Sequence, residues 1–322
     1  MKTDVVAAAE YARAVALLRD GEVVALPTET VYGLAAGALN ATAVAKIFEA
    51  KERPRFDPLI VHLPHRDWLE KVADLQGRDR QLIEKLAGAF WPGPFTLVLS
   101  KRDLVPDIVT AGLDTVAVRV SSHPVFGKVI RGFGAPLAAP SANRFGRISP
   151  TAAAHVFEEL SGRIPLIVDG GPTEHGLEST IVALRNGRIE VLRRGPVTER
   201  QLAEFSEVVV VKSSQRPEAP GQLPSHYAPS TPLILIDDAG SFSPAAGRRY
   251  GLLSWKSSAS TGCAEVRRLS ERQDLIEAAA NLFRYLRELD NLGLHLIVAE
   301  TLPEEGLGAA INDRLRRAST RN

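Results

Sequence analysis

The feature that most constrains the fold is a repeated alternation of helix-like and strand-like segments through the first two hundred residues. Apolar residues recur at helical spacing from Val5 to Leu18, and a short apolar run from Val23 to Leu26 follows and predicts a strand. The same reasoning predicts helices over 43–50, 80–90 and 151–160 and strands over 59–63, 95–99, 115–120, 136–139, 166–169, 179–184 and 188–193. This alternation indicates an α/β domain, and the adjacent strands near its end indicate a mixed sheet.

A change of composition after Val211 divides the chain of 322 residues. Residues 212–232 are rich in Pro and Ser and show no helical or strand period, which is typical of an interdomain linker. Beyond them the pattern predicts strands over 233–236, 251–255 and 294–298 and a helix over 275–289. The sequence therefore predicts a larger α/β domain over 1–211, a linker over 212–232 and a small α/β domain over 233–322.

Charge and cysteine content exclude several classes of protein. Lys and Arg number 39 against 38 Asp and Glu, so a net charge of +1 provides no global field that would attract a polyanion. The only cysteine, Cys263, can form neither an intrachain disulfide nor a cysteine-rich zinc site, which agrees with a reducing compartment. No signal peptide and no membrane span of about 18 apolar residues is visible, so a cytoplasmic location is expected.

Strong nucleotide, zinc and serine-hydrolase motifs are absent, because the sequence contains no GxxxxGK[ST], GxGxxG, HExxH or GxSxG segment in a fitting context. The candidate site must therefore come from polar clusters at strand ends. In PTETVYGL, directly after the strand 23–26, Thr28, Glu29 and Thr30 either form part of a site or cap a helix or turn.

Two further segments carry cations. In KERPRFDPL, the alternating Lys51, Arg53 and Arg55 would share one face of an extended segment and suit a phosphate; a solvated charged loop is the alternative. Arg119 projects from the strand 115–120 on the face opposite a row of valines, and its partner is either a buried carboxylate or a substrate carboxylate. His62, within the strand 59–63, is either a satisfied core histidine or a ligand-binding group.

Small polar side chains follow the strand 136–139. In APSANRFGRISPT, Ser141 and Asn143 offer hydroxyl and amide groups that suit a phosphate or a ribose. The alternative is ordinary turn chemistry, with Ser149 as the cap of the helix 151–160.

Four segments, PTETVYGL, KERPRFDPL, PSAN and GLESTIV, resemble in order and spacing the YrdC family of ATP-dependent carbamoylating enzymes. This likeness spans about the first two thirds of the chain. The segment PGQLPSHYAP and the small domain after it are similar to the longer, two-domain members of the family, the threonylcarbamoyl-AMP synthases. The resemblance implies a YrdC-like twisted mixed sheet with flanking helices, joined to a small Rossmann-like domain.

The resemblance also implies a reaction. L-Threonine, bicarbonate or CO2, and ATP with Mg²⁺ would give L-threonylcarbamoyladenylate and pyrophosphate, which is nucleotidyltransferase chemistry. The tRNA threonylcarbamoyl transferase machinery would then use the product to make N6-threonylcarbamoyladenosine. Neither membrane association nor tight tRNA binding is expected, and no protein metal ligand is assigned.

By the same resemblance, two sets of residues are assigned to subsites. The threonine-binding set is Thr30, His62, Arg119, Ala139 and Ser179, and the ATP-binding set is Lys51, Arg53, Asp57, Thr115, Ser141, Asn143, Ser149, Arg193 and Tyr227. Lys51 and Arg53 would be catalytic, because a carboxylate that attacks the α-phosphorus must approach another anion and cations neutralise the triphosphate. Tyr227, in HYAP, would make the linker a lid over the nucleotide.

One residue departs from the family pattern, and two other functions remain open. Asp57 stands where the family usually has Asn, and its carboxylate would repel phosphates, bind magnesium or the ribose, or point away. A carbamoyl transferase that uses carbamoyl phosphate normally carries an acylphosphatase-like domain and zinc-finger cysteines, which are not seen here. An RNA-binding or ribosome-associated module would use Lys51, Arg53 and Arg55 with Arg193 and Arg194 as a basic patch.

Overall fold

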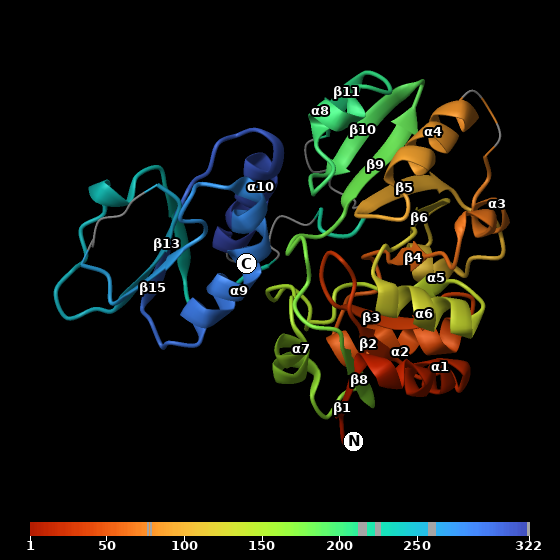
Figure 1. Cartoon of the computed structure of the whole chain (residues 1–322), viewed down its shortest axis with the longest axis horizontal. Helices are drawn as coiled ribbons and strands as arrows, with labels where there is room; N and C mark the ends of the chain where they lie inside the picture. The colour runs from red at the N-terminus through yellow and green to blue at the C-terminus, as the bar shows by residue number, and fades with distance from the viewer. Residues whose placement is uncertain (76, 78, 212–217, 223–226, 257–261, 321–322) are drawn as a thin grey trace.

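The chain forms two α/β units, each built on its own sheet (Figure 1). The computed structural model describes residues 1–75, 77, 79–211, 218–222, 227–256 and 262–320. The first unit carries an eleven-stranded mixed sheet, and the second carries a four-stranded parallel sheet. Residues 212–217 and 223–226 of the predicted linker lie outside the described residues.

The large sheet runs in the order β1-β8-β2-β3-β7-β4-β6-β5-β9-β10-β11. Its strands are β1 Asp4–Ala7, β2 Val24–Leu26, β3 Gly33–Gly37, β4 Ile60–His62, β5 Phe95–Ser100, β6 Thr115–Arg119, β7 Leu137–Ala138, β8 Leu166–Asp169, β9 Thr180–Arg185, β10 Arg188–Arg193 and β11 Val208–Val210. The α-helices of this unit are α1 Tyr11–Arg19, α2 Ala41–Lys51, α3 Leu69–Val72, α4 Arg80–Phe90, α5 Asp107–Thr110, α6 Pro124–Phe133, α7 Ala153–Leu160 and α8 Glu199–Leu202.

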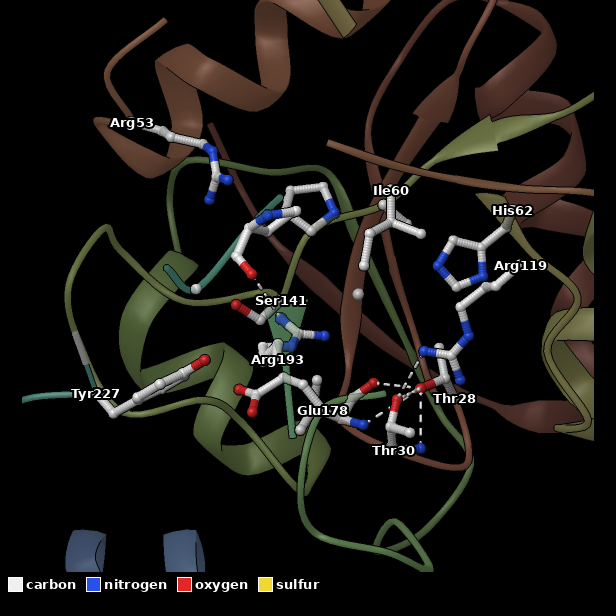
Figure 2. A pocket seen from close by; sticks show the side chains of 16 residues that line it. Thr28, Thr30, Arg53, Ile60, His62, Arg119, Ser141, Glu178, Arg193 and Tyr227 are labelled. Atoms are coloured by element: carbon white, nitrogen blue, oxygen red, sulfur yellow. Dashed lines mark hydrogen bonds between the residues drawn. The ribbon is translucent and has the colours of Figure 1, made fainter. Parts of the chain in front are cut away.

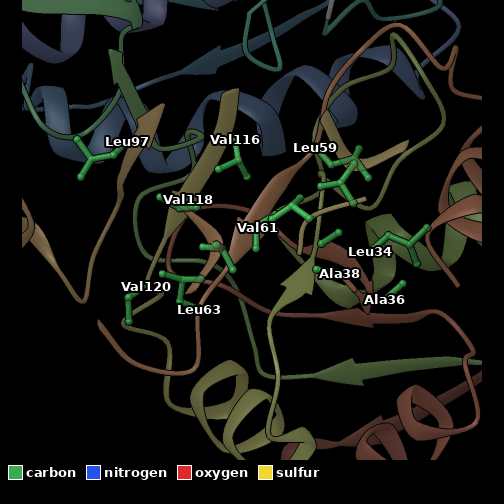
Figure 3. Packing of buried hydrophobic residues seen from close by; sticks show 14 of the residues in the cluster. Leu34, Ala36, Ala38, Leu59, Val61, Leu63, Leu97, Val116, Val118 and Val120 are labelled. Carbon is green, nitrogen blue, oxygen red and sulfur yellow. The ribbon is translucent and has the colours of Figure 1, made fainter. Parts of the chain in front are cut away.

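Strand alternation separates the core from the side chains that can form a site. On β4 and β6, Val61 and Val118 pack into the main hydrophobic cluster, which Figure 3 shows from close by. The parallel register pairs His62 directly with Arg119, so these two polar side chains end neighbouring strands on the other face. Burial of the valine face thus fixes where the two polar groups point.

The predicted mixed sheet is confirmed, and most predicted elements lie within a few residues of the observed ones. The helix predicted over 5–18 is wrong at its start, because residues 4–7 form β1 and pair with β8. Strand β3 was missed, since its sequence GLAAG has little β propensity and owes its conformation to pairing with β2 and β7. Helix α6 was also missed, although it has Pro124 in its first turn and Gly134 after its end.

The second unit has the strand order β12-β15-β13-β14. Its elements are β12 Leu233–Ile236, β13 Tyr250–Ser254, β14 Glu265–Arg268, α9 Leu275–Asp290, β15 Leu296–Glu300 and α10 Gly306–Ser319. Helices α9 and α10 lie between this sheet and the first unit (Figure 1). No helix within the described parts of the chain is both long and apolar enough to cross a membrane.

A buried carboxylate ties together the strand ends of the second unit. Glu300, the last residue of β15, accepts the backbone N–H groups of Trp255 and Lys256 at 2.6 and 2.9 Å. It also accepts the Ser254 hydroxyl at 3.0 Å and the Ala239 N–H at 2.8 Å. These bonds offset the cost of burying the charge and hold two loops against the same side chain.

Candidate functional site

A pocket opens at the strand ends of the first unit (Figure 2). Its lining residues are Thr28, Thr30, Val31, Gly33, Arg53, Ile60, His62, Arg119, Ala139, Pro140, Ser141, Glu178, Arg193, Pro220, Gly221 and Tyr227. Figure 2 shows Thr28, Thr30, His62 and Arg119 at one end, which we call the Arg119 end. Arg53 and Tyr227 lie at the opposite end, which we call the Arg53 end.

The loop after β2 is held in shape by its own hydroxyl groups. Thr28 donates its hydroxyl to the Val31 carbonyl at 2.7 Å and accepts the backbone N–H groups of Thr30 and Val31. This is the turn chemistry that the sequence left open for Thr28, and it also presents Thr30 to the pocket. At Gly33, a Cβ would lie 3.3 Å from the Ala139 Cβ, so the absence of a side chain lets β3 approach the pocket wall closely.

Arg119 forms a buried ion pair at its end of the pocket. Its Nη2 lies 2.6 Å from Glu29 Oε1, and both side chains are almost fully buried. Nη1 donates to Thr30 at 3.2 Å, and Nε has no hydrogen-bond partner among the described residues. Burial alone would raise the pKa of Glu29, but Arg119 and the Ser121 hydroxyl outweigh it and lower that pKa from 4.5 to about 2. Glu29 is therefore ionised and fixes the guanidinium in place.

His62 faces the same end as a neutral imidazole. Burial, with a smaller effect from Arg119, lowers the pKa of His62 from 6.5 to about 3. Its ring packs against Phe126 with a centroid separation of 4.6 Å, and its Nδ1 has no partner among the described residues. A buried, unpaired ring nitrogen aimed at a pocket is a group that a ligand can satisfy.

Arg53 is held by a second buried ion pair. Its Nη2 lies 2.8 Å from Asp57 Oδ2 and donates to the Pro58 carbonyl at 2.9 Å. Burial raises the pKa of Asp57, an effect that Arg53 opposes. Asp57 does not line the pocket, and its charge is directed at Arg53.

The predicted row of three cations is wrong at Arg55. Helix α2 continues to Lys51, and Glu52 then takes the left-handed conformation with φ of 53°, so the segment is not extended. Arg55 is exposed, whereas Lys51 is fully buried behind the pocket wall. Lys51 donates to the carbonyls of Ser141, at 2.6 Å, and Asn143, and burial together with Arg53 holds the pKa of Lys51 well below 10.5.

Arg193 joins the two ends of the pocket from β10. Its guanidinium donates to the Ser179 carbonyl at 2.9 Å and to the Pro220 carbonyl at 3.1 Å. The Ser179 hydroxyl also bonds to the Thr96 hydroxyl at 2.7 Å. Arg193 therefore connects the first unit to the segment that leads to Tyr227, a side chain whose pKa burial and Glu178 raise to about 12.

The structure brings most of the predicted site residues to this pocket. Those that line it are Thr30, His62, Arg119, Ala139, Arg53, Ser141, Arg193 and Tyr227. Behind the lining are Lys51, Asp57, Asn143, Ser149 and Ser179. Thr115, at the start of β6, lies at the opposite end of its strand from Arg119 and outside the lining. The N-cap alternative for Ser149 is wrong, because α7 begins at Ala153 with Ala152 as its N-cap, and the Ser149 hydroxyl donates to Glu178.

Glu178 is the charged residue of the pocket lining to which the sequence analysis assigned no role, whereas Glu29 was considered there as part of a site or as a cap. Glu178 stands one residue before Ser179 in GLESTIV, and a carboxylate at a strand entry beside several cations was the available signal. The backbone of the linker residues Pro220 and Gly221 gave no comparable signal, because glycine and proline are ordinary in linkers.

Two family models cover nearly the whole chain. One, described as Telomere recombination, matches residues 16–195, and the other, described as Threonylcarbamoyl-AMP synthase, C-terminal domain, matches residues 197–320. The site described above lies within the first match, except for Tyr227 and its preceding segment.

Full-length relatives and solved structures agree with these matches. A threonylcarbamoyl-AMP synthase of Bacillus subtilis is 42% identical over 96% of this chain and 93% of its own length, and one of Pyrococcus abyssi is 41% identical over 95% and 93%. A crystal structure of P. abyssi Sua5 complexed with L-threonine superposes with a TM-score of 0.88 at 38% identity, covering 99% of this chain and 98% of that one. The chain therefore belongs to the two-domain threonylcarbamoyl-AMP synthase family.

Proposed function

We propose that this protein is an enzyme that makes L-threonylcarbamoyladenylate and pyrophosphate from L-threonine, bicarbonate or CO2, and ATP. The observation that carries the proposal is one pocket in which three buried arginines, Arg53, Arg119 and Arg193, face a common space. Two anionic reactants must meet in this reaction, and cations held by neutral and acidic partners lower the repulsion between them. The printed names of the relatives support the same activity.

The Arg119 end suits an amino acid. A guanidinium on a half-buried strand recognises a carboxylate through two parallel hydrogen bonds, and Arg119 Nε is a donor without a partner among the described residues. The neutral His62 ring, the Thr30 hydroxyl and the small Ala139 complete a wall with polar and apolar parts. L-Threonine is the ligand named for the P. abyssi structure, and we assign it to this end.

The Arg53 end suits the nucleotide. Arg53 and Arg193 line it, and Lys51 keeps the loop of Ser141 and Asn143 in place from behind. The threonine amine takes up CO2 as a carbamate, whose oxygen attacks the α-phosphorus. The new bond joins this oxygen to phosphorus, and the bond to pyrophosphate breaks. Positioning and charge stabilisation are the contributions of the chain's own residues.

Magnesium belongs to this proposal as the companion of ATP, where it would neutralise phosphate charge. Among the described residues, no three His, Cys, Asp or Glu side chains gather into a metal site. We therefore expect the phosphates and water, with at most single protein oxygens, to hold the ion. Tyr227 lines the pocket and would cover the nucleotide as part of a lid.

A handover to the tRNA-modifying machinery and a cytoplasmic location complete the proposal. A net charge of +1 supports the expectation that the protein does not hold tRNA tightly, because counterion release would supply little affinity. The adenylate would then leave the pocket for a partner enzyme that carries out the group transfer to adenosine.

The test is pyrophosphate release by the pure protein with ATP, magnesium and bicarbonate, with and without L-threonine, followed by mass spectrometry of the nucleotide product. We expect threonine-dependent pyrophosphate and the mass of threonylcarbamoyl-AMP. Arg119→Met should raise the KM for threonine by about thirtyfold or more, because truncating one partner of a buried charge pair is costly. The exposed Arg55→Met is the matched control. ATP binding without threonine-dependent turnover would refute the proposal. Turnover of carbamoyl phosphate would then indicate a carbamoyl transferase, and salt-dependent RNA binding would indicate an RNA-binding module.

A further inference from the structure

The second unit places one arginine at the wall of the first unit's pocket. Arg314, on α10, is fully buried, and its Nε lies 3.1 Å from Glu178 Oε2. Glu178 lines the pocket and is only 6% exposed. Its other oxygen accepts the Ser149 hydroxyl. One carboxylate of the pocket wall is thus held from both sides, by a serine of its own unit and by a guanidinium of the other.

The surroundings of Arg314 are part of the same junction. Its guanidinium lies over the Tyr227 ring at 5.5 Å, and that ring stacks on Phe283 of α9 with centroids 5.5 Å apart. Arg314 Nη1 bonds to Asp313 at 3.1 Å, and Nη2 has no partner among the described residues. The same helix pair therefore contacts both Glu178 and Tyr227, two side chains that line the pocket.

Helix α9 of the second unit packs closely against the segments next to Glu178 and Ser149. At Gly176, two residues before Glu178, a Cβ would lie 2.5 Å from the Ala279 carbonyl oxygen of α9. Arg287 of α9 donates to the carbonyl of Ile148, the residue before Ser149. Helix α9 therefore contacts the backbone near Glu178 and the backbone next to Ser149, the two residues that share a hydrogen bond.

An unpaired carboxylate at this place would oppose the binding of phosphates. Glu178 lies in the same lining as three arginines whose positive charges suit anions. Its negative charge acts to raise the pKa of one of them, Arg193. Without Arg314, the buried Glu178 carboxylate would have only the Ser149 hydroxyl as its partner, or it would turn to Arg193 and draw that cation away from the ligand.

We propose that Arg314 is a positioning residue for the nucleotide: it neutralises and orients Glu178, so the Arg53 end of the pocket accepts phosphates only when the second unit is docked. This inference rests on the proposed function. It assigns the second unit a direct part in substrate binding, through a contact that spans 136 positions of the chain. Arg314 lies over Tyr227, which Figure 2 shows at the Arg53 end, so threonine binding at the Arg119 end should depend on this contact far less.

The experiment compares the full-length variants Arg314→Met, Glu178→Gln and the double variant, with Arg316→Met as the control on the same helix. Arg316 is half exposed and pairs with Glu304, away from the pocket. We expect Arg314→Met to raise the KM for ATP about tenfold or more, and the KM for threonine less than about threefold, because the uncompensated Glu178 carboxylate acts at the Arg53 end. The double variant should return the KM for ATP to within about threefold of wild type, since the uncompensated charge is gone.

Melting temperatures separate this role from a structural one. A double variant that regains stability but keeps the raised KM for ATP would overturn the inference, as would equal kinetics for Arg314→Met and Arg316→Met. If Arg314→Met does not fold, Arg314→Lys replaces it: a lysine retains the positive charge and should retain most of the affinity for ATP, and a loss of that affinity in a stable Arg314→Lys variant would overturn the inference. Wild-type protein without threonine-dependent pyrophosphate release would refute the proposed function instead, and this is measured first.

Discussion

Replacing Glu29 by Gln tests how much the buried ion pair at the Arg119 end contributes to stability. The fall of the Glu29 pKa from 4.5 to about 2 measures how strongly the folded state prefers the ionised carboxylate. Each tenfold change in the acid constant is worth about 1.4 kcal/mol, so the ionised group stabilises the fold by about 3 kcal/mol at neutral pH. For a domain of about 200 residues this corresponds to a loss of roughly 6–12 °C in melting temperature.

The stabilisation by ionised Glu29 should depend on pH in a direction that follows from its lowered pKa. Because the folded pKa is the lower one, the contribution is complete well above pH 4.5 and declines as the pH falls from about 4.5 toward 2. Urea unfolding at pH 7 and at lower pH should therefore show a gap between wild type and Glu29→Gln that narrows with acid. The partly exposed pair of Glu22 with Lys46 provides the control, Glu22→Gln, with an expected loss of about 0–1 kcal/mol.

Ligand binding supplies a second readout of the same change. In Glu29→Gln, Arg119 has lost its carboxylate partner, so the carboxylate of L-threonine becomes its strongest available contact. Threonine should consequently raise the melting temperature of the variant more than that of wild type. Equal stabilities at pH 7, or a gap that does not change with pH, would show that Arg119 and Glu29 do not interact as argued.

Three further changes test other parts of the structure. Lys51→Met leaves the carbonyls of Ser141 and Asn143 without their donor and should cost about 1–3 kcal/mol, mainly through the buried bond to Asn143, measured by urea unfolding. Phe95→Ala empties a fully buried site and should cost about 3–5 kcal/mol in the same assay; a smaller loss would mean that the core collapses around it. Gly176→Ala forces a Cβ against the α9 backbone and should increase the radius of gyration in small-angle scattering, whereas an unchanged radius would contradict the close contact.

The strand-end residues could be predicted because alternation on a strand fixes direction. Once a row of valines is assigned to the core, Arg119 must point the other way, and the structure places it in the pocket with His62 beside it. The sequence left its partner open, and the structure shows a buried carboxylate, Glu29. Strand β3 could not be predicted, because its glycines and alanines do not favour a strand and its conformation depends on pairing with β2 and β7.

Contacts between distant segments could not be predicted from local patterns. Glu178 and Arg314 are far apart in the chain, and neither has a spacing that indicates the other. The row of cations failed for a local reason, since α2 extends to Lys51 and Glu52 reverses the backbone, which sends Arg55 to solvent. The second case shows that side-chain direction depends on where an element ends, which is the least predictable part of a pattern.

The hydrogen bonds of Glu300 make local opening of the second unit measurable by hydrogen exchange. The amides of Ala239, Trp255 and Lys256 belong to two loops but donate to one carboxylate, so their deuterium exchange should share a single rate set by the joint release of both loops. The same carboxylate ties the described loops after β12 and β13 to the carboxyl end of β15, so movement of either loop would disturb one shared set of hydrogen bonds.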